Sequence, residues 1–223
     1  MHIPTSKSHS IRGLFMALMA AGESTLTHLL RSNDTQDALH VCKTLGAHIR
    51  VQGDHVIVDG PESLCTSTDY LNTGNSGITT RFTLPLLGLR KHPTPIIVDC
   101  GDQMRTRPIR DLLHALSSLG LSIDSLKAPD CLPIRISGKL QGGQVCLDGL
   151  SSQHLSALLL TLPLAHQPSE ITVNDLHGQP YIDMTLQWLS SQHIQYQRET
   201  KKNKTIYSVP GNQRYHHFHT TLT

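Results

Sequence analysis

The residues best suited to chemistry in this sequence are small polar and basic side chains that lie where loops turn into helices. The first group is residues 6–12, SKSHSIR, just before and within the first turn of a predicted helix. Helix N-termini carry unpaired backbone N–H groups and the positive end of the helix dipole, so they favour anions. Lys7 and Arg12 oppose that dipole by up to about 1 kcal/mol each, and a negative ligand would compensate them. The alternative is a solvated N-terminus with Ser8 or Ser10 as an ordinary cap.

Two further groups have the same position relative to predicted helices. Residues 73–77, TGNSG, are small and let a ligand approach the backbone, although a glycine-rich turn is the simpler interpretation. Residues 101–108, GDQMRTRP, place Arg107 before a proline expected at the first helical position. The planar guanidinium suits a carboxylate or phosphate, and the alternative is a surface arginine paired with Asp102 or Asp111.

The last two groups are rich in hydrogen-bond donors. Residues 151–153, SSQ, offer short donors at a helix start, which is a way to hold phosphate without a P-loop. Residues 179–183, QPYID, open another predicted helix. Each group alone is explained by capping. If all lie at equivalent ends of a repeated unit, however, they converge on one surface, and capping does not require that.

Composition and missing motifs exclude several classes of function. The formal net charge of +2 gives no electrostatic footprint for duplex nucleic acid. The motifs GxxxxGK[ST], GxGxxG and HExxH are missing, so nucleotide-binding and metalloprotease interpretations have no anchor. Five scattered cysteines disfavour a disulfide framework or zinc site, and the spacing of His216, His217 and His219 matches no usual zinc pattern. We therefore expect no metal, no nucleic acid and no membrane partner.

Hydrophobic spacing predicts the elements that position these groups. Apolar residues recur at i, i+3, i+4 and i+7 from Ile11 and again from Ala38, which is typical of helices with one buried stripe. The order helix, strand, helix, hairpin then repeats with a period of roughly 70 residues, which indicates three equivalent units around one core. The predicted strands are residues 24–30, 48–52, 55–59, 95–100, 121–126, 132–137, 144–148 and 169–173. The predicted helices after the first two are residues 75–87, kinked at Pro85, and those carrying Leu112, Leu158 and Leu186.

We predict a single lobe of residues 1–223 with repeats at about 6–63, 64–140 and 141–211. Residues 212–223 would be a truncated connection, of which 215–223 are expected to fray, while 198–204 form an exposed hairpin turn. Residues 13–21 also have features of a secretory signal peptide, following Lys7 and Arg12. Their two counterparts in the later repeats favour an inner helix instead.

The polar segments resemble motifs of the EPSP synthase family of enolpyruvyl transferases. Residues 6–12 are similar to its SKSxSxR opening and residues 74–77 to its GNAG or GNSG turn. Arg107-Pro108 is similar to its RP motif, and residues 151–159 to its SSQ…ALL helix, with 180–183 (PYID) matching as well. The similarity runs from about Pro4 to Gly211 in the family's order and resembles its N-terminal half. The related transferase acting on UDP-N-acetylglucosamine shares the fold but not the SKS and SSQ signatures.

The resemblance implies an α/β fold, one lobe of the inverse α/β barrel, with three repeated units of inner helices and outer mixed sheets. It implies transfer of the enolpyruvyl group of phosphoenolpyruvate to the 5-hydroxyl of shikimate 3-phosphate, with release of phosphate. This is a step of aromatic amino-acid biosynthesis, the shikimate pathway, and no metal or organic cofactor is expected.

The family's site residues carry over motif by motif. Lys7 would be catalytic and lie between the substrates. The residues implied to contact shikimate 3-phosphate are Lys7, Ser8, Arg12, Ser151, Ser152, Gln153 and Tyr181. Those implied on the phosphoenolpyruvate side are Lys7, Asn75, Gly77, Arg107 and Gln153.

Three positions depart from the family pattern. Ile78 and Phe82 stand where many members carry threonine and proline, which would shift the start of the inner helix and alter glyphosate sensitivity. Gly178 stands where a phosphate-binding serine is common, and this removes a donor worth about 1 kcal/mol.

The family is also roughly twice as long as this chain, and its second lobe supplies the acidic general acid/base and further Lys and Arg groups. The chain is thus expected to bind shikimate 3-phosphate weakly and to be inactive alone, in the cytoplasm, with the complete enzyme a monomer. The alternative is a non-catalytic sugar-phosphate-binding or partner-docking module on the same scaffold.

Overall fold

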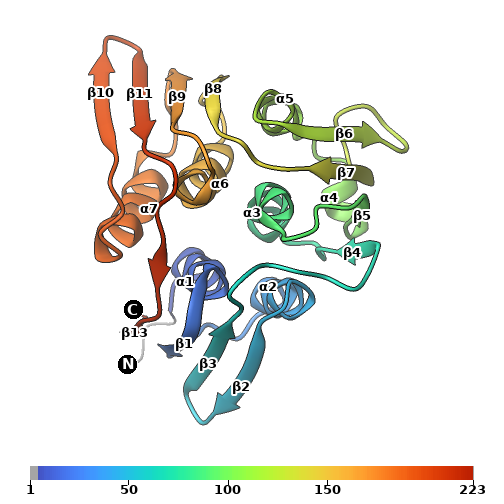
Figure 1. Ribbon diagram of the computed structural model, residues 1–223, viewed down its shortest axis with the longest axis vertical. Helices are drawn as coiled ribbons and strands as arrows, with labels where there is room; N and C mark the ends of the chain where they lie inside the picture. Colours follow the sequence, from blue (N-terminus) through green and yellow to red (C-terminus); the bar gives the residue numbers. More distant parts are fainter. Residues whose placement is uncertain (1–4, 223) are drawn as a thin grey trace.

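The computed structural model describes residues 5–222 and has helices inside and sheets outside. Three mixed sheets lie at the periphery, and the helices fill the space between them (Figure 1). The fold class expected from the sequence, one lobe with inner helices and outer mixed sheets, is confirmed. None of the helices in this part of the chain has the length and apolar character needed to cross a bilayer.

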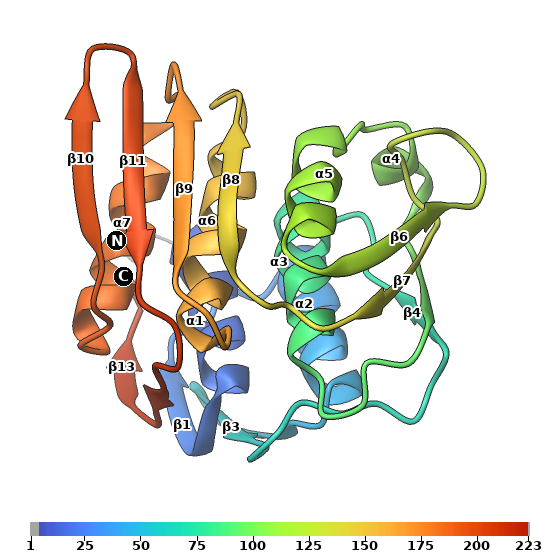
Figure 2. The same ribbon diagram turned by 45° about the horizontal axis from the view of Figure 1, so that its top comes forward.

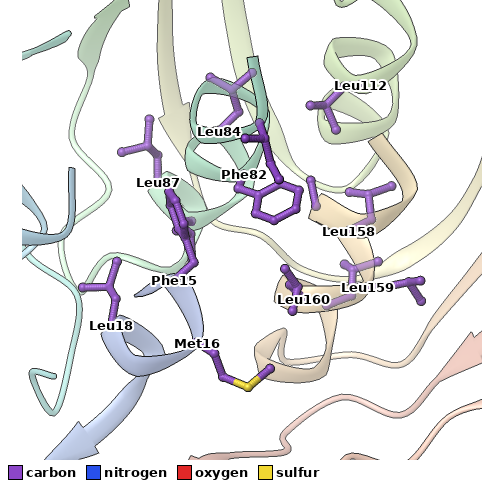
Figure 3. Close-up of a cluster of buried hydrophobic side chains, with 14 of the residues drawn as sticks. Phe15, Met16, Leu18, Phe82, Leu84, Leu87, Leu112, Leu158, Leu159 and Leu160 are labelled. Carbon is purple, nitrogen blue, oxygen red and sulfur yellow. The ribbon is translucent and has the colours of Figure 1, made fainter. Parts of the chain in front are cut away.

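The inner helices are hydrophobic almost all round because they are buried on nearly every side. They are α1 (Lys7–Met19), α3 (Gly77–Leu86) and α6 (Ser152–Thr161). Figure 3 shows side chains of all three meeting in the core, among them Phe15, Phe82 and Leu158. Pro85 lies in the last turn of α3, which passes directly into a 3-10 turn at Leu87–Leu89. Residues 13–18 are buried in this core, as expected for an inner helix.

The outer helices have one apolar stripe and separate the sheets from each other (Figure 2). They are α2 (Asn33–Thr44), α5 (Arg110–Ser118) and α7 (Gln179–Ser191). Ser32 closes the start of α2 with a capping box. Because each outer helix packs between two sheets, the three units share one core.

The second and third sheets have the same strand pattern. A parallel strand pair is followed by an antiparallel strand and its hairpin partner. The second sheet contains β4 (Tyr70–Asn72), β5 (Ile96–Asp99), β7 (Ile134–Gly138) and β6 (Leu121–Ser125). The third contains β8 (Gly143–Leu147), β9 (Ser169–Asn174), β11 (Lys204–Val209) and β10 (Gln197–Lys201). The predicted hairpins are confirmed, including the exposed turn at Lys202–Asn203.

The first sheet is completed by the C-terminal end of the chain. Its first three strands are β1 (Ala20–Thr27), β3 (His55–Gly60) and β2 (His48–Gln52). The strands β12 (Tyr215–His216) and β13 (His219–Thr221) pair parallel with β1 and take the edge position that β4 and β8 hold in the other sheets. The expectation that this tail frays is therefore wrong for residues 215–222.

Other differences from the sequence-based expectation are local. The strand expected at 24–30 starts at Ala20, because Ala20 is already extended where α1 ends. A short helix, α4 (Asp102–Arg105), precedes α5, and the N-cap of α5 is Ile109, so Pro108 is not its first residue.

We predict that the C-terminal strands contribute to folding. Tyr215 is buried, and its hydroxyl donates to the Leu160 carbonyl at 2.8 Å. Tyr215→Ala removes the packing and leaves that carbonyl without its partner, so the free energy of unfolding should fall by about 3–5 kcal/mol in urea titrations. The control His216→Ala, at an exposed neighbouring position, should change it by less than about 0.5 kcal/mol. Equal effects of the two variants would contradict this role.

Candidate functional site

Arg12 ties the starts of three helices together. Its guanidinium donates to the Ser8 carbonyl at 3.1 Å, within α1. Across the core it donates to Thr185 Oγ1 at 2.8 Å and to the Tyr181 carbonyl at 3.1 Å, both on α7. It also donates to Ser156 Oγ on α6, at 3.1 Å. The N-terminal ends of α1, α6 and α7 therefore lie side by side.

The Arg12 charge is buried without an opposite charge. The side chain is 1% exposed, and no carboxylate lies within ion-pair distance of it in residues 5–222. Burial lowers the pKa of Arg12 to about 10, so the group remains charged at neutral pH. The centroid of the Phe82 ring lies 5.3 Å from Arg12 Cζ, in a cation–π contact. Phe82, which departs from the family pattern, therefore packs against Arg12. An anion near Arg12 would be strongly favoured.

The start of α6 has hydroxyl donors that no other group among residues 5–222 uses. Ser151 is the N-cap residue, yet its side chain makes no capping hydrogen bond. The capping explanation for this segment is therefore wrong at Ser151. Ser152 follows at the first helical position, and its hydroxyl likewise has no partner among the described residues. Orphan N–H groups and free hydroxyls at a helix start are the kind of donors that bind anions in other proteins.

Gly178 brings the start of α7 against this segment. It is the N-cap of α7 with φ +70°, and a Cβ built on it would lie 3.0 Å from Ser152 Oγ. A larger residue at 178 would therefore be strained and would crowd Ser152. Tyr181, one turn into α7, is 49% exposed and lies beside the same segment, since its ring is 3.8 Å from that Cβ position.

The residues described so far form a first cluster, at the starts of α6 and α7. A second cluster, of Gly77, Arg107 and Gln153, forms at the start of α3. A Cβ on Gly77 would lie 3.6 Å from an Arg107 guanidinium nitrogen and 3.7 Å from Gln153 Oε1. Three residues expected on the phosphoenolpyruvate side are thus brought together from three separate segments. Arg105, not Arg107, pairs with Asp102, at 2.8 Å, and none of the ion pairs among residues 5–222 involves Arg107.

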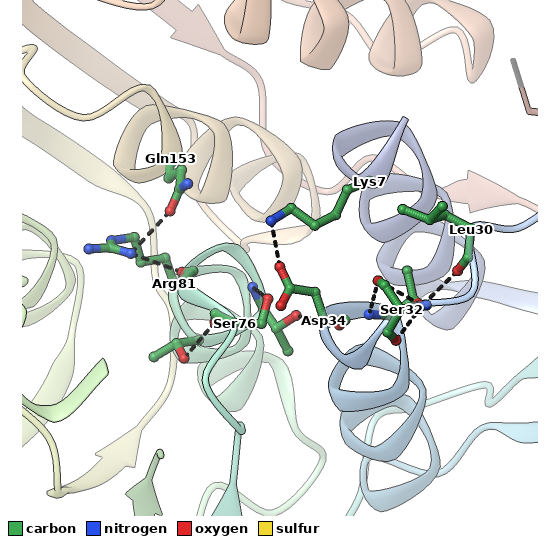
Figure 4. Close-up of polar contacts among 11 residues, drawn as sticks. Lys7, Leu30, Ser32, Asp34, Ser76, Arg81 and Gln153 are labelled. Carbon is green, nitrogen blue, oxygen red and sulfur yellow. Dashed lines mark hydrogen bonds and ion pairs between the residues drawn. The ribbon is translucent and has the colours of Figure 1, made fainter. Parts of the chain in front are cut away.

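Lys7 reaches from the start of α1 toward the second cluster. Figure 4 shows its side chain extending from α1 across the gap toward α3 and α6, with Gln153 on one side and Asp34 on the other. Its ammonium group forms an ion pair with Asp34 at 2.6 Å, and the side chain is 51% exposed. Exposed ion pairs typically contribute about 0–1 kcal/mol to stability. Lys7 can therefore leave Asp34 at little cost and pair with another anion.

The structure does not bring the Asn75 side chain to this cluster. It lies over Gly101 instead, where a Cβ would fall 2.1 Å from Asn75 Oδ1. The backbone N–H groups of Asn75 and Ser76 donate to the Asp37 carboxylate. These hydrogen bonds lower the pKa of Asp37, but burial has the larger effect and raises it. Ser76 caps α3 by accepting from the Thr79 N–H at 3.3 Å. This turn is therefore already satisfied by the chain itself, unlike the start of α6.

Sequence reasoning missed two residues of the second cluster. Arg81 donates to Gln153 Oε1 and to the Gly77 carbonyl, both at 3.1 Å. Its Nε donates to His154 Nε2 at 3.3 Å. The signal was the spacing, because Arg81 stands one helical turn after Gly77 and so returns over the same helix start. No group of three His, Cys, Asp or Glu in residues 5–222 is arranged to hold a metal ion.

Comparison with known proteins gives a consistent result. The sequence matches the family described as EPSP synthase (3-phosphoshikimate 1-carboxyvinyltransferase) over residues 1–221. It is 39% identical to the 3-phosphoshikimate 1-carboxyvinyltransferase of Acetivibrio thermocellus, covering 99% of this chain and 51% of that protein. It is 36% identical to the protein of the same name from Chlamydia trachomatis serovar L2, covering 94% and 49%.

The fold is similar to a solved one. EPSP synthase from Acinetobacter baumannii superposes with a TM-score of 0.84 at 22% identity, covering 100% of this chain and 49% of that one. The chain thus spans about half the length of the relatives it matches.

We predict that His154 makes stability depend on pH. Burial first, and then the Arg81 charge, lower its pKa from 6.5 to about 4, while Asp148 acts in the opposite direction. Between pH 4 and 6.5 the unfolded chain binds this proton more readily, so stability is lost as the pH falls through that window. When the pH is lowered from 7 to 4.5, the free energy of unfolding measured in urea titrations should fall by about 2 kcal/mol more in the wild type than in His154→Gln. The exposed control His48→Gln should follow the wild type, and parallel curves for all three would contradict the prediction.

Proposed function

The chain belongs to the EPSP synthase family, and from this premise we propose that it is the shikimate 3-phosphate-binding half of a 3-phosphoshikimate 1-carboxyvinyltransferase. The complete enzyme would transfer the enolpyruvyl group of phosphoenolpyruvate to the 5-hydroxyl of shikimate 3-phosphate and release phosphate, in the cytoplasm. Residues 1–223 would form one lobe, and a second lobe would face its helix starts and act as its partner.

The observation that carries the proposal is the unused donor set at the start of α6. The hydroxyls of Ser151 and Ser152 have no partner in residues 5–222, and the helix end there has no side-chain cap. A phosphate group has enough acceptor oxygens to take both hydroxyls and the backbone N–H groups together. We assign the phosphate of shikimate 3-phosphate to this segment.

The remaining assignments follow from the two clusters. Arg12 and Ser8 would hold the rest of the shikimate molecule, with Tyr181 and Gln153 along its ring. Gly77, Arg107 and Gln153 would form the phosphoenolpyruvate side, and Asn75 would join them if its side chain turned away from Gly101. Lys7 would contact both substrates and stabilise charge as the enolpyruvyl group moves.

The isolated chain supplies only one wall of this site. Lys7 and Arg107 are exposed, so charges at the site are screened by water. The acid/base group and a closing wall would come from a second lobe, and without them turnover should be negligible. A non-catalytic binding module on the same scaffold differs in requiring no second lobe.

We predict that the chain binds shikimate 3-phosphate through Ser151 and Arg12. In calorimetric titration, Ser151→Ala should weaken binding about tenfold, because it removes a hydrogen bond to a charged group. Arg12→Ala should reduce binding below detection, since both the buried positive charge and its hydrogen bonds to α6 and α7 are lost. The control Ser190→Ala, at an exposed position near the other end of α7, should bind as the wild type does. No heat from the wild type at millimolar ligand would refute the proposal.

We also predict that a second lobe restores catalysis. The chain mixed with the C-terminal half of a related enzyme should release phosphate from the two substrates, and neither part should do so alone. Lys7→Ala should abolish this activity while leaving the fold intact, because Lys7 is exposed and makes one surface ion pair. Binding of shikimate 3-phosphate without any rescue of phosphate release would favour the non-catalytic module.

A further inference from the structure

Arg81 is a largely buried cation with no opposite charge against it. None of the ion pairs among residues 5–222 involves it. Its partners are the Gly77 carbonyl, Gln153 Oε1 and His154 Nε2, with Met104 Sδ at 3.9 Å. Figure 4 shows the guanidinium directed at the Gln153 side chain. A charged group held by several hydrogen bonds restricts the orientation of the side chains that it contacts.

The chemistry of Arg81 decides how the Gln153 amide is oriented. A guanidinium has only donors, so the atom of Gln153 that meets it at 3.1 Å must be the carbonyl oxygen. The Nε2 N–H groups of Gln153 then point away from Arg81, and they have no other partner in the described chain. The carbonyl oxygen of Gln153 is therefore occupied, and the side chain can offer only its N–H donors to a ligand.

His154 fixes Arg81 from the other side by the same logic. The Arg81 Nε–H donates to His154 Nε2, so that ring nitrogen carries a lone pair and the imidazole is neutral. The lowered pKa of His154 agrees with this. Two effects lower the pKa of Arg81: burial first, and then the positive charge of Arg107. An anion placed between Arg107 and Gln153 would relieve the repulsion.

We propose that Arg81 is a positioning residue: it holds Gln153 with its amide N–H groups toward the bound anion, and His154 holds Arg81 in that orientation. Gln153 then selects an acceptor at this point of the ligand, such as a carboxylate, phosphate or ether oxygen. The identity of that anion as shikimate 3-phosphate or phosphoenolpyruvate rests on the proposed function.

A double-mutant cycle tests whether Arg81 acts through Gln153. Shikimate 3-phosphate is titrated into the wild type, Arg81→Lys, Gln153→Ala and the double variant. We expect Gln153→Ala to bind about tenfold more weakly and Arg81→Lys about fivefold, with the double variant no weaker than Gln153→Ala. Additive losses, or no loss in Arg81→Lys, would overturn the proposal. The control Arg90→Lys changes a buried arginine that donates to the Leu87 and Thr94 carbonyls, and it should leave affinity unchanged.

Gln153→Glu tests the same idea without disturbing Arg81. The carboxylate keeps the contact with Arg81 and replaces the donors by acceptors, so the variant should fold at least as stably as the wild type. It should nevertheless bind shikimate 3-phosphate more weakly than Gln153→Ala does. Binding equal to that of the wild type would overturn the proposal.

A ligand-free measurement separates this inference from the proposed function. The side-chain amide signal of Gln153 in a ¹⁵N–¹H spectrum, assigned by its loss in Gln153→Ala, should shift in Arg81→Lys and not in Arg90→Lys. If it shifts while the wild type binds no shikimate 3-phosphate, the positioning contact stands and the proposed function fails. If it does not shift, the positioning contact is refuted whatever the chain binds.

Discussion

A positive charge buried among helix starts is the constraint on which the rest of the site depends. Arg12 is 1% exposed and charged, and its partners are hydroxyl and carbonyl oxygens rather than a carboxylate. Neutral dipoles recover only part of the hydration that a buried ion loses, and the positive helix ends nearby add to the cost. The fold tolerates this because the same hydrogen bonds join α1, α6 and α7. The Arg12 guanidinium is thereby held in a fixed position by α1, α6 and α7.

The three units repeat an architecture without repeating a binding site. The start of α3 is capped by Ser76, and its preceding turn is satisfied by Asp37, whereas α6 begins with hydroxyls that cap nothing. Guanidinium groups gather near α3, and short donors gather near α6. Equivalent helix ends thus differ in chemistry: guanidinium groups lie near the start of α3, and free hydroxyls lie at the start of α6.

The first unit shows how closure of the fold involves the ends of the chain. In the second and third sheets, the parallel edge strand comes just before its unit in the sequence. In the first sheet that place is taken by β12 and β13, far along the chain, so the edge of β1 is covered by residues 215–221. An uncovered edge invites pairing with other chains. The C-terminal strands therefore hold the first unit, including α1 and its charged start, against the third.

Most of the helices and hairpins could be predicted from the sequence, because apolar periodicity and turn residues are local signals that each segment carries. The stripe from Ile11 and the turn at Gly53-Asp54 are examples, and the motifs located most of the helix starts of the candidate site. Long-range contacts were needed to place Tyr215–His216 and His219–Thr221 in strands, to turn Asn75 toward Gly101, and to bring Arg81 against Gln153 and His154. Those outcomes depend on pairing with β1 and on contacts between α3 and α6. A hydrogen bond between residues more than 70 positions apart leaves no local pattern, since its geometry exists only once the core has packed.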